Sequence, residues 1–427
     1  MNAATEMIRS IGPVDIMLAA AETDHRPRYK VNSHVHLPPN FSAFTTVGQV
    51  PELAKQQDVR VLGVTNYYDY RVYGEFAGLA KKAGVFPLFG LEIITLIEAL
   101  AEAKVKINDP GNPGRMYLCG KGVTHFDPVP PEAAGILESI RRNDTRRMRD
   151  MVEKAAALFR AADCDLGITE PGVKRMIVNR HGCPEDTVHL QERHIAQAFQ
   201  EALFAKVPAE ARAATLAGVY GAAPKASSDD AVATQNEFRT NLLKAGKPAF
   251  VAESSVAERD ARKMILSMGG IPCYPVLADG AKPLCLYEET PEKLIANILA
   301  MGVHMAEFIP VRNTREVLEK YARAMRAAGI ALVAGTEHNT LELIPLDPAC
   351  LDGVPIPEEV KAIFWEGACV VAAHQFLAAH GRGGYVDETG IPFGEHDSAD
   401  ERIKAMAALG AAVIQAYIAN LDNGKHG

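Results

Sequence analysis

The chain has 427 residues, of which 48% are hydrophobic and 23% charged. This composition is typical of a soluble globular protein and excludes a low-complexity or disordered chain. The net charge of −8 disfavours nucleic acid as a partner, because an acidic protein gains nothing from a polyanion. The length fits two or three domains, or one α/β barrel enlarged by insertions.

The sequence predicts neither a membrane span nor an export signal. No uninterrupted apolar run approaches the ~20 residues that a span needs, since Glu92 and Glu98 break even the stretch 85–100. The weakly apolar segment 11–21 is interrupted by Asp15 and makes a poor signal peptide. Seven cysteines without a CxxC pair are typical of reduced thiols. We therefore expect a cytoplasmic protein with no membrane partner.

Short apolar runs alternate with segments of helical period, which is the pattern of an α/β fold. The first part of the chain predicts strands and helices in alternation, at 29–35, 47–57, 60–65, 75–83 and 85–93. The middle part reads as helical, with periodic stretches at 133–142, 145–162, 187–204 and 236–245, and with an exposed loop at 221–230.

The alternation then resumes, with a helix first, at 257–268, 270–276, 291–301, 304–309, 315–328 and 331–335. Two further helices are predicted at 357–379 and 399–421, and we expect them to pack on the barrel or on a neighbouring subunit. The order of elements predicts an α/β barrel that is interrupted by a helical insertion and followed by a helical tail.

Polar residues stand where the predicted strands end, which is where barrel enzymes place their chemistry. His34 and His36 close the first strand and share one face, so that both imidazoles can reach one cation. Glu92 follows an apolar run, and a buried carboxylate needs a cationic partner. Glu337 and His338 follow another apolar run. Imidazole nitrogens combined with carboxylate oxygens suit zinc, manganese or iron.

Four segments, in order and spacing, resemble the motifs of the PHP superfamily, named for polymerase and histidinol phosphatase. They are HVH at 34–36, GLE at 90–92, the helix start RHIA at 193–196, and GTEH at 335–338. The resemblance implies a distorted seven-stranded (β/α)7 TIM-like barrel that holds divalent metals and usually hydrolyses phosphate esters. It also suggests three parts: an N-terminal extension (1–28), the barrel (29–340, with the insertion at about 131–245) and a helical C-terminal extension (341–427).

The resemblance assigns six metal ligands, with Glu92 as the bridging carboxylate. They are His34, His36, Glu92, His194, Glu337 and His338. Three other ligand positions of the family are altered. Tyr67 belongs to TNYYD, where the family has Thr-Asp-His; the segment 115–120 carries no histidine; and Tyr274 stands where histidine would be. We therefore expect one divalent ion (zinc, manganese or iron) and a second held more weakly, with the loop residue His125 either replacing a lost ligand or simply exposed.

The resulting hypothesis is a metal-dependent phosphoesterase acting on a small phosphorylated metabolite, a sugar phosphate or a nucleotide. Glu92 would hold the metal, and Tyr67 or Tyr274 would orient the substrate or donate a proton, unless both only pack at strand ends. Lys121, between two glycines, is a candidate for binding the anion. Arg146 is a second candidate, although its arginine-rich helix is more typical of a solvated face.

Two alternatives stay open. One is a mononuclear metal enzyme acting on a lactone, an amide or a sugar. The other is a barrel that has lost catalysis and binds a small ligand. A homo-oligomer is compatible with both. Nucleotide-binding classes are disfavoured, because no GxGxxG follows a strand and no Walker A motif is present.

Overall fold

The computed structural model describes residues 2–22, 27–253 and 255–423. Its centre is a sheet in the order β1-β2-β3-β4-β6-β7-β8, with the two-residue strand β5 paired to β3. The strands are β1 (Lys30–Val35), β2 (Val59–Tyr67), β3 (Phe86–Leu96), β4 (Arg115–Lys121), β5 (Val256–Ala257), β6 (Ile271–Val276), β7 (Met305–Phe308) and β8 (Ala331–Ala334).

The sheet nearly closes into a barrel, which confirms the predicted fold class. β1, β2 and β3 run parallel, as do β6, β7 and β8. A parallel bridge between Val35 and Glu337 joins the first strand to the chain after the last one. β4 is antiparallel to both of its neighbours, so the barrel is not a regular repeat of strand and helix. Local sequence period carries no information on strand direction, and the prediction did not contain this reversal.

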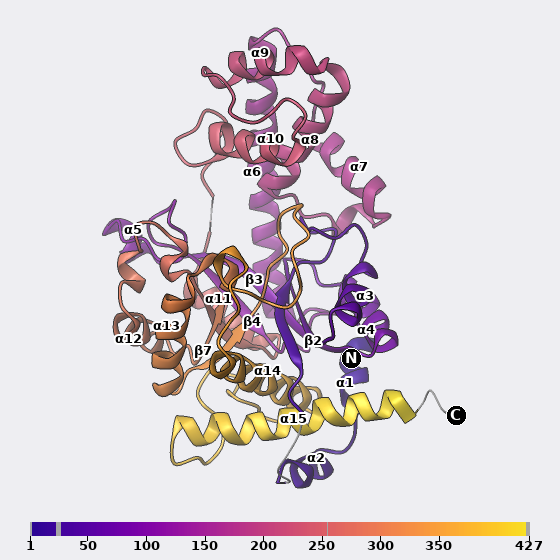
Figure 1. Cartoon of the computed structure of the whole chain (residues 1–427), viewed down its shortest axis with the longest axis vertical. Helices are drawn as coiled ribbons and strands as arrows, with labels where there is room; N and C mark the ends of the chain where they lie inside the picture. Colours follow the sequence, from indigo (N-terminus) through magenta and orange to yellow (C-terminus); the bar gives the residue numbers. More distant parts are fainter. Residues whose placement is uncertain (1, 23–26, 254, 424–427) are drawn as a thin grey trace.

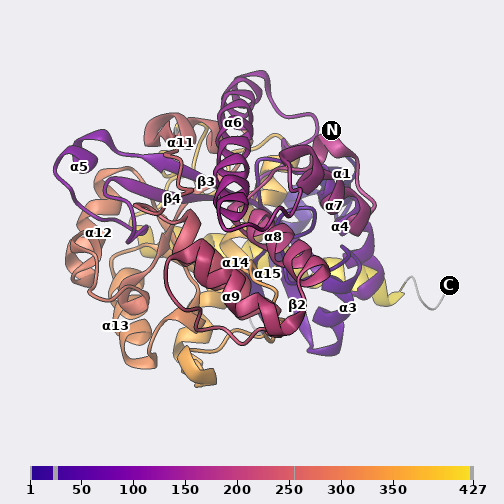
Figure 2. The ribbon, with the colours of Figure 1, turned by 90° about the horizontal axis from the view of Figure 1, so that it is seen from above.

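Helices surround the barrel (Figures 1 and 2). Those between barrel strands are α3 (Gln49–Gln56), α4 (Val72–Ala83), α5 (Glu98–Glu102), α11 (Glu258–Ser267), α12 (Pro291–Ala300) and α13 (Arg315–Ala327). Two short helices, α1 (Ala3–Arg9) and α2 (Val14–Ala21), precede β1. The amphipathic faces of the longer helices supply part of one continuous core with the strands.

The chain between β4 and β5 forms a helical insertion at one end of the molecule, drawn at the top of Figure 1. Its helices are α6 (Pro131–Ala161), α7 (Glu170–His181), α8 (Glu192–Lys206), α9 (Ala209–Tyr220) and α10 (Ala231–Phe238), followed by a π-helical turn (Arg239–Leu243). The insertion has a core of its own, in which the rings of Phe159, Phe199 and Phe238 lie 5.1–6.1 Å apart.

The insertion differs from the prediction in two ways. The stretches 133–142 and 145–162 form one continuous helix of 31 residues, which packs into the barrel core up to Ile140 and into the core of the insertion from Met148 onward. The helices α7 and α9 were not predicted as separate elements. Each has only two buried apolar residues, Val173 and Ile177 in α7 and Leu216 and Val219 in α9, and each ends at a glycine in the left-handed region, Gly182 and Gly221.

The helices α14 (Glu358–Ala379) and α15 (Ala399–Asn423) close the opposite end of the barrel (Figure 1). Their approach depends on glycine, since a Cβ at Gly367 would lie 1.8 Å from the Leu332 carbonyl oxygen. A Cβ at Gly410 would be equally close to the carbonyl of Cys369. By length and composition both helices could cross a membrane, but 72% and 50% of the respective windows are buried inside the protein. Packing on the barrel therefore accounts for much of the apolar composition of α14.

Candidate metal centre

β1 and the residue after it place two imidazoles side by side. The Nε2 atoms of His34 and His36 lie 3.3 Å apart, and both side chains are buried. Glycines on the two neighbouring segments make room for them. A Cβ at Gly335 would lie 2.3 Å from the Cβ of His34, and a Cβ at Gly63 would lie 2.4 Å from the Ser33 carbonyl oxygen. The glycine of the GTEH motif is therefore a packing requirement of this site.

Glu92 on β3 completes a group of three donors. Its Oε2 lies 3.2 Å from Nε2 of His36 and 3.7 Å from Nε2 of His34. The three donor atoms lie within 4.8 Å of one another. Within the described residues, Oε2 of Glu92 has no hydrogen-bond partner, although the atom is buried. Buried polar atoms without partners are uncommon in proteins, and this oxygen beside two imidazole nitrogens fits a divalent cation that accepts nitrogen and oxygen ligands.

The protonation of His36 agrees with a ligand role. Burial lowers its pKa below the ordinary value, although Glu92 acts in the opposite direction. The imidazole is therefore neutral at pH 7, which is the form that binds metals. Tyr67 at the end of β2 covers this ring, with the two ring planes 7° apart and the centroids 5.2 Å apart. Burial and the nearby Glu92 raise the pKa of Tyr67, so its hydroxyl stays protonated.

A carboxylate that was not among the predicted site residues, Glu307, orients the His34 ring through its Nδ1 atom. Oε2 of Glu307, on β7, lies 2.7 Å from Nδ1 of His34. Its Oε1 accepts a hydrogen bond of 2.5 Å from the Lys121 ammonium. Although burial disfavours the charged carboxyl, the His34 imidazole and the Lys121 ammonium lower the pKa of Glu307 to about 2. Outer carboxylates of this kind fix the tautomer of a metal-binding histidine. The signal in the sequence was a lone glutamate within the apolar run MAEF at 305–308.

Glu337 and His338 lie next to each other but turn in different directions. Both have positive φ angles of 57° and 51°, a conformation that is strained for residues other than glycine. The Glu337 carboxylate accepts hydrogen bonds from Arg312 and Asn339 at the pocket. His338 has both nitrogens engaged, Nδ1 with the Thr336 hydroxyl at 2.7 Å and Nε2 with the Ile344 carbonyl at 2.9 Å. The structure therefore brings Glu337 to the site but not the imidazole of His338.

His194, the fourth expected histidine ligand, lies at the start of α8 and outside the donor group. Its Nδ1 accepts a hydrogen bond of 3.0 Å from the backbone of Gln191, which forms a capping box. Its ring meets that of Phe41 edge-on, at 5.2 Å. Burial is the main reason that the pKa of His194 falls to about 3. In this conformation its role is to cap the helix, although its Nε2 has no partner among the described residues.

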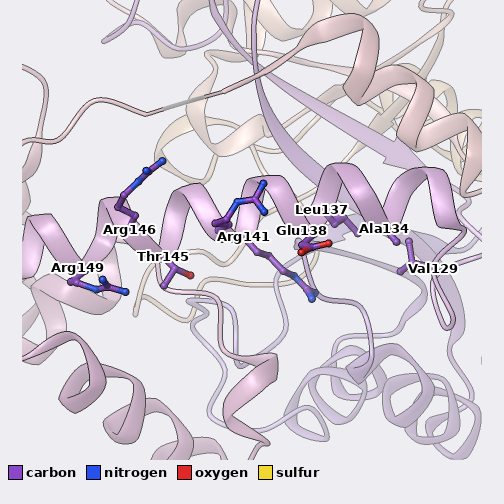
Figure 3. Close-up of a pocket in the computed structure, with 9 residues that line it drawn as sticks. Val129, Ala134, Leu137, Glu138, Arg141, Thr145, Arg146 and Arg149 are labelled. Carbon is purple, nitrogen blue, oxygen red and sulfur yellow. The ribbon is translucent and has the colours of Figure 1, made fainter.

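Four further candidates also lie away from the donor group. Tyr274 is buried and donates its hydroxyl to Glu288 at 2.6 Å. Lys121 is directed into the barrel, where its side chain is 3% exposed. Arg146 lies on an exposed face of α6, in a surface hollow that is separate from the site (Figure 3). His125 is exposed in its loop.

A pocket of about 630 Å³ lies over the donor group, between the barrel and the insertion. Glu92, Tyr67 and Glu337 line it from the barrel. The insertion and the segment after it contribute most of the cations that line it, namely Arg147, Arg193, Arg239 and Lys244. The sequence could not show this wall, because the packing of the insertion over the strand ends is a tertiary feature.

One carboxylate serves three of these cations. Glu192 binds Arg147 at 2.6 Å and lies 3.8 Å from both Arg239 and Lys244. For Arg193 the described residues provide no ion pair. Burial and the neighbouring Arg239 lower the pKa of Arg193 to about 10, so it remains a cation at pH 7. Arg147 also pairs with Glu253 at 2.8 Å, and Glu253, Asp109 and Asp144 line the pocket as well. Among the described residues of this wall, Arg193 is therefore the cation without a close carboxylate.

Comparison with known proteins agrees with the fold. The sequence matches no protein-family model and no curated protein. A solved structure from Bifidobacterium adolescentis, to which metal-dependent phosphoesterase activity is ascribed, is similar with a TM-score of 0.53 and 15% identity, over 79% of this chain and 96% of that one. An amidohydrolase from Chromobacterium violaceum, solved with sulfate and without metal, has a TM-score of 0.49 and 19% identity, over 78% and 96% of the respective chains. At these identities the likeness to the first structure shows a shared fold.

Proposed function

We propose that the chain is a divergent member of the PHP superfamily and a metal-dependent hydrolase of phosphate esters of small metabolites. One observation carries the proposal: the donor group of His34, His36 and Glu92 opens, through Glu92, into a pocket whose wall presents Arg193, a cation without an ion pair among the described residues. The fold that the chain shares with a protein of ascribed metal-dependent phosphoesterase activity supports it.

Each residue of the group has a defined part in this proposal. His34, His36 and Glu92 would hold one divalent cation, which supplies Lewis-acid polarisation of the ester and activation of water. Glu307 keeps the Nε2 of His34 free for the metal by binding its Nδ1. Tyr67 covers His36 and presents a protonated hydroxyl near Glu92, where it can donate to the substrate.

The cations of the insertion define the substrate side of the pocket. Arg193 lacks an ion pair among the described residues, and Arg239 has a buried Nε that donates to nothing. Guanidinium groups match phosphate geometry, and a lysine adds a point charge. A phosphoryl group in the pocket would supply acceptors to Arg193 and to Nε of Arg239, and it would lie beside Lys244, which Glu192 approaches only to 3.8 Å. A neutral lactone, amide or sugar would leave Arg193 without a charged partner, which is why we favour the phosphate ester.

A substrate panel tests the proposal. Metal-free protein reloaded with Mn²⁺ or Zn²⁺ should release phosphate from sugar phosphates or nucleotides and should leave amides and lactones of the same size intact. Arg193→Ala and Lys244→Ala should each raise KM for the phosphate ester at least tenfold. Arg146→Ala is the matched control and should change nothing, because Arg146 lies in the separate hollow. Turnover of a lactone or amide without phosphatase activity would favour the non-phosphate alternative, and metal-loaded protein without any hydrolysis would favour a binding role.

A further inference from the structure

A second group of donor atoms lies inside the barrel. The described residues contain two groups of three ligand atoms within 4.8 Å of one another, and the second consists of His34, Cys119 and Glu307. Cys119 and Glu307 are fully buried, on β4 and β7. By distance and donor type alone, this group could take a zinc or cobalt ion as readily as the first.

The ammonium group of a lysine, Lys121, already binds the carboxylate of this group. Lys121 follows Cys119 by two residues on β4 and therefore shares its face of the sheet. Its ammonium donates to Oε1 of Glu307 at 2.5 Å, to the Ser33 carbonyl at 3.1 Å and to the Thr65 hydroxyl at 3.3 Å. Three donors thus meet three acceptors, so the ammonium is fully satisfied where it lies.

Glu307 and Glu92, the two carboxylates beside His34, differ in whether their oxygens have hydrogen-bond partners. Glu307 has both oxygens engaged, one with Lys121 and one with His34. Glu92 keeps a buried oxygen without a hydrogen bond. A cation that enters the barrel therefore finds an available carboxylate at Glu92, but at Glu307 it would have to displace a bound ammonium of like charge.

We propose that Lys121 is a fixed internal cation that takes the place of a second metal ion, so that the centre is mononuclear. The inference rests on the proposed function, because it presupposes the first metal site. It assigns Lys121 a positioning role through Glu307 and His34 rather than contact with the substrate. Neutralising Lys121 should make the group of His34, Cys119 and Glu307 available to a metal.

Cobalt binding tests this directly, because a thiolate bound to Co²⁺ gives a near-ultraviolet charge-transfer band and only the second group contains a cysteine. Metal-free wild-type protein should bind one equivalent of Co²⁺ without this band. Lys121→Met, of similar length but uncharged, should bind a second equivalent and gain the band. Adding Cys119→Ser should remove the band again, and the charge-conserving Lys121→Arg should behave as wild type. If the methionine variant does not fold, Lys121→Gln keeps donors for Ser33 and Thr65.

The outcomes separate the two proposals. A thiolate band in the wild-type protein, or a folded neutral variant that binds no second equivalent, overturns the role of Lys121. Wild-type protein that binds no Co²⁺ contradicts the proposed function instead. In that case the band in Lys121→Met still reports on the second group, because Cys119 belongs to that group alone.

Discussion

The Nδ1 atom of His34 and the Oε2 atom of Glu307 lie 2.7 Å apart in the barrel interior, where both side chains are almost fully buried. This contact links the donor group at the pocket to Lys121 beneath it. Because Nδ1 binds Glu307, the other ring nitrogen of His34, Nε2, faces Glu92. The geometry of the candidate centre is therefore set by residues that do not line the pocket.

The ion pair of Lys121 and Glu307 should stabilise the fold as a unit. Lys121→Met or Glu307→Gln alone should lower the free energy of unfolding by about 3 kcal/mol, because each leaves a buried charge without its partner. The double variant should lose much less than the sum of the two. Urea denaturation of the four proteins measures the coupling, and strictly additive losses would contradict it.

Acid should destabilise the metal-free protein through His194. Its pKa is about 3 in the folded protein, against an ordinary value of 6.5. The neutral imidazole therefore contributes stability that is complete above pH 6.5 and is lost as the pH falls towards 3, at up to roughly 1.4 kcal/mol per unit. His194→Gln keeps a capping-box side chain and should flatten this dependence. His125→Gln, in an exposed loop, should leave it unchanged, and identical slopes in all three proteins would refute the assignment.

The two tyrosines that stand where the family has histidines should behave differently. Tyr67→Phe retains the ring over His36 but loses the hydroxyl near Glu92, so kcat should fall at least tenfold with metal affinity kept. Tyr274→Phe loses a hydrogen bond to Glu288, and neither residue lines the pocket, so the change should cost about 1 kcal/mol of stability without changing kcat. Steady-state kinetics paired with thermal denaturation distinguish these effects, and the reverse pattern would exchange the two roles.

Space at Gly335 should be essential to the site. Gly335→Ala should destabilise the protein by roughly 1–3 kcal/mol and weaken metal binding, because the new methyl group collides with the Cβ of His34. Gly74→Ala adds a methyl group on α4 with nothing within 4 Å and should be neutral or slightly stabilising. Calorimetric melting temperatures of the two variants test the contrast, and equal effects would show that Gly335 is not constrained.

The sequence predicted the parts of this site that depend on local pattern. The HVH segment closes the first predicted strand and the GLE segment follows an apolar run, and the alternation of strands and helices placed both at one rim of the barrel. Glu307 could have been found in the same way, as a single carboxylate within an apolar strand. The direction of the His338 side chain could not, since it depends on a left-handed backbone and on Thr336 and Ile344.

Contacts that arise from tertiary packing also could not be predicted from the sequence. Lys121 lies in the barrel because β4 runs antiparallel between β3 and β6, and the sequence period does not report strand direction. The cationic wall exists because the insertion packs over the strand ends. The capping role of His194 was not predicted either, because the family motif suggested a metal ligand at this position, whereas the local hydrogen bonds form a helix cap.

The most direct measurement is calorimetric titration of the metal-free protein with Mn²⁺ or Zn²⁺, together with His36→Ala, Glu92→Gln and the control Arg146→Ala. We expect one saturable equivalent in the wild-type and control proteins, and binding at least tenfold weaker in the two site variants. Wild-type protein that binds no metal, or site variants that bind it as tightly as wild type, would contradict a metal centre built from His34, His36 and Glu92.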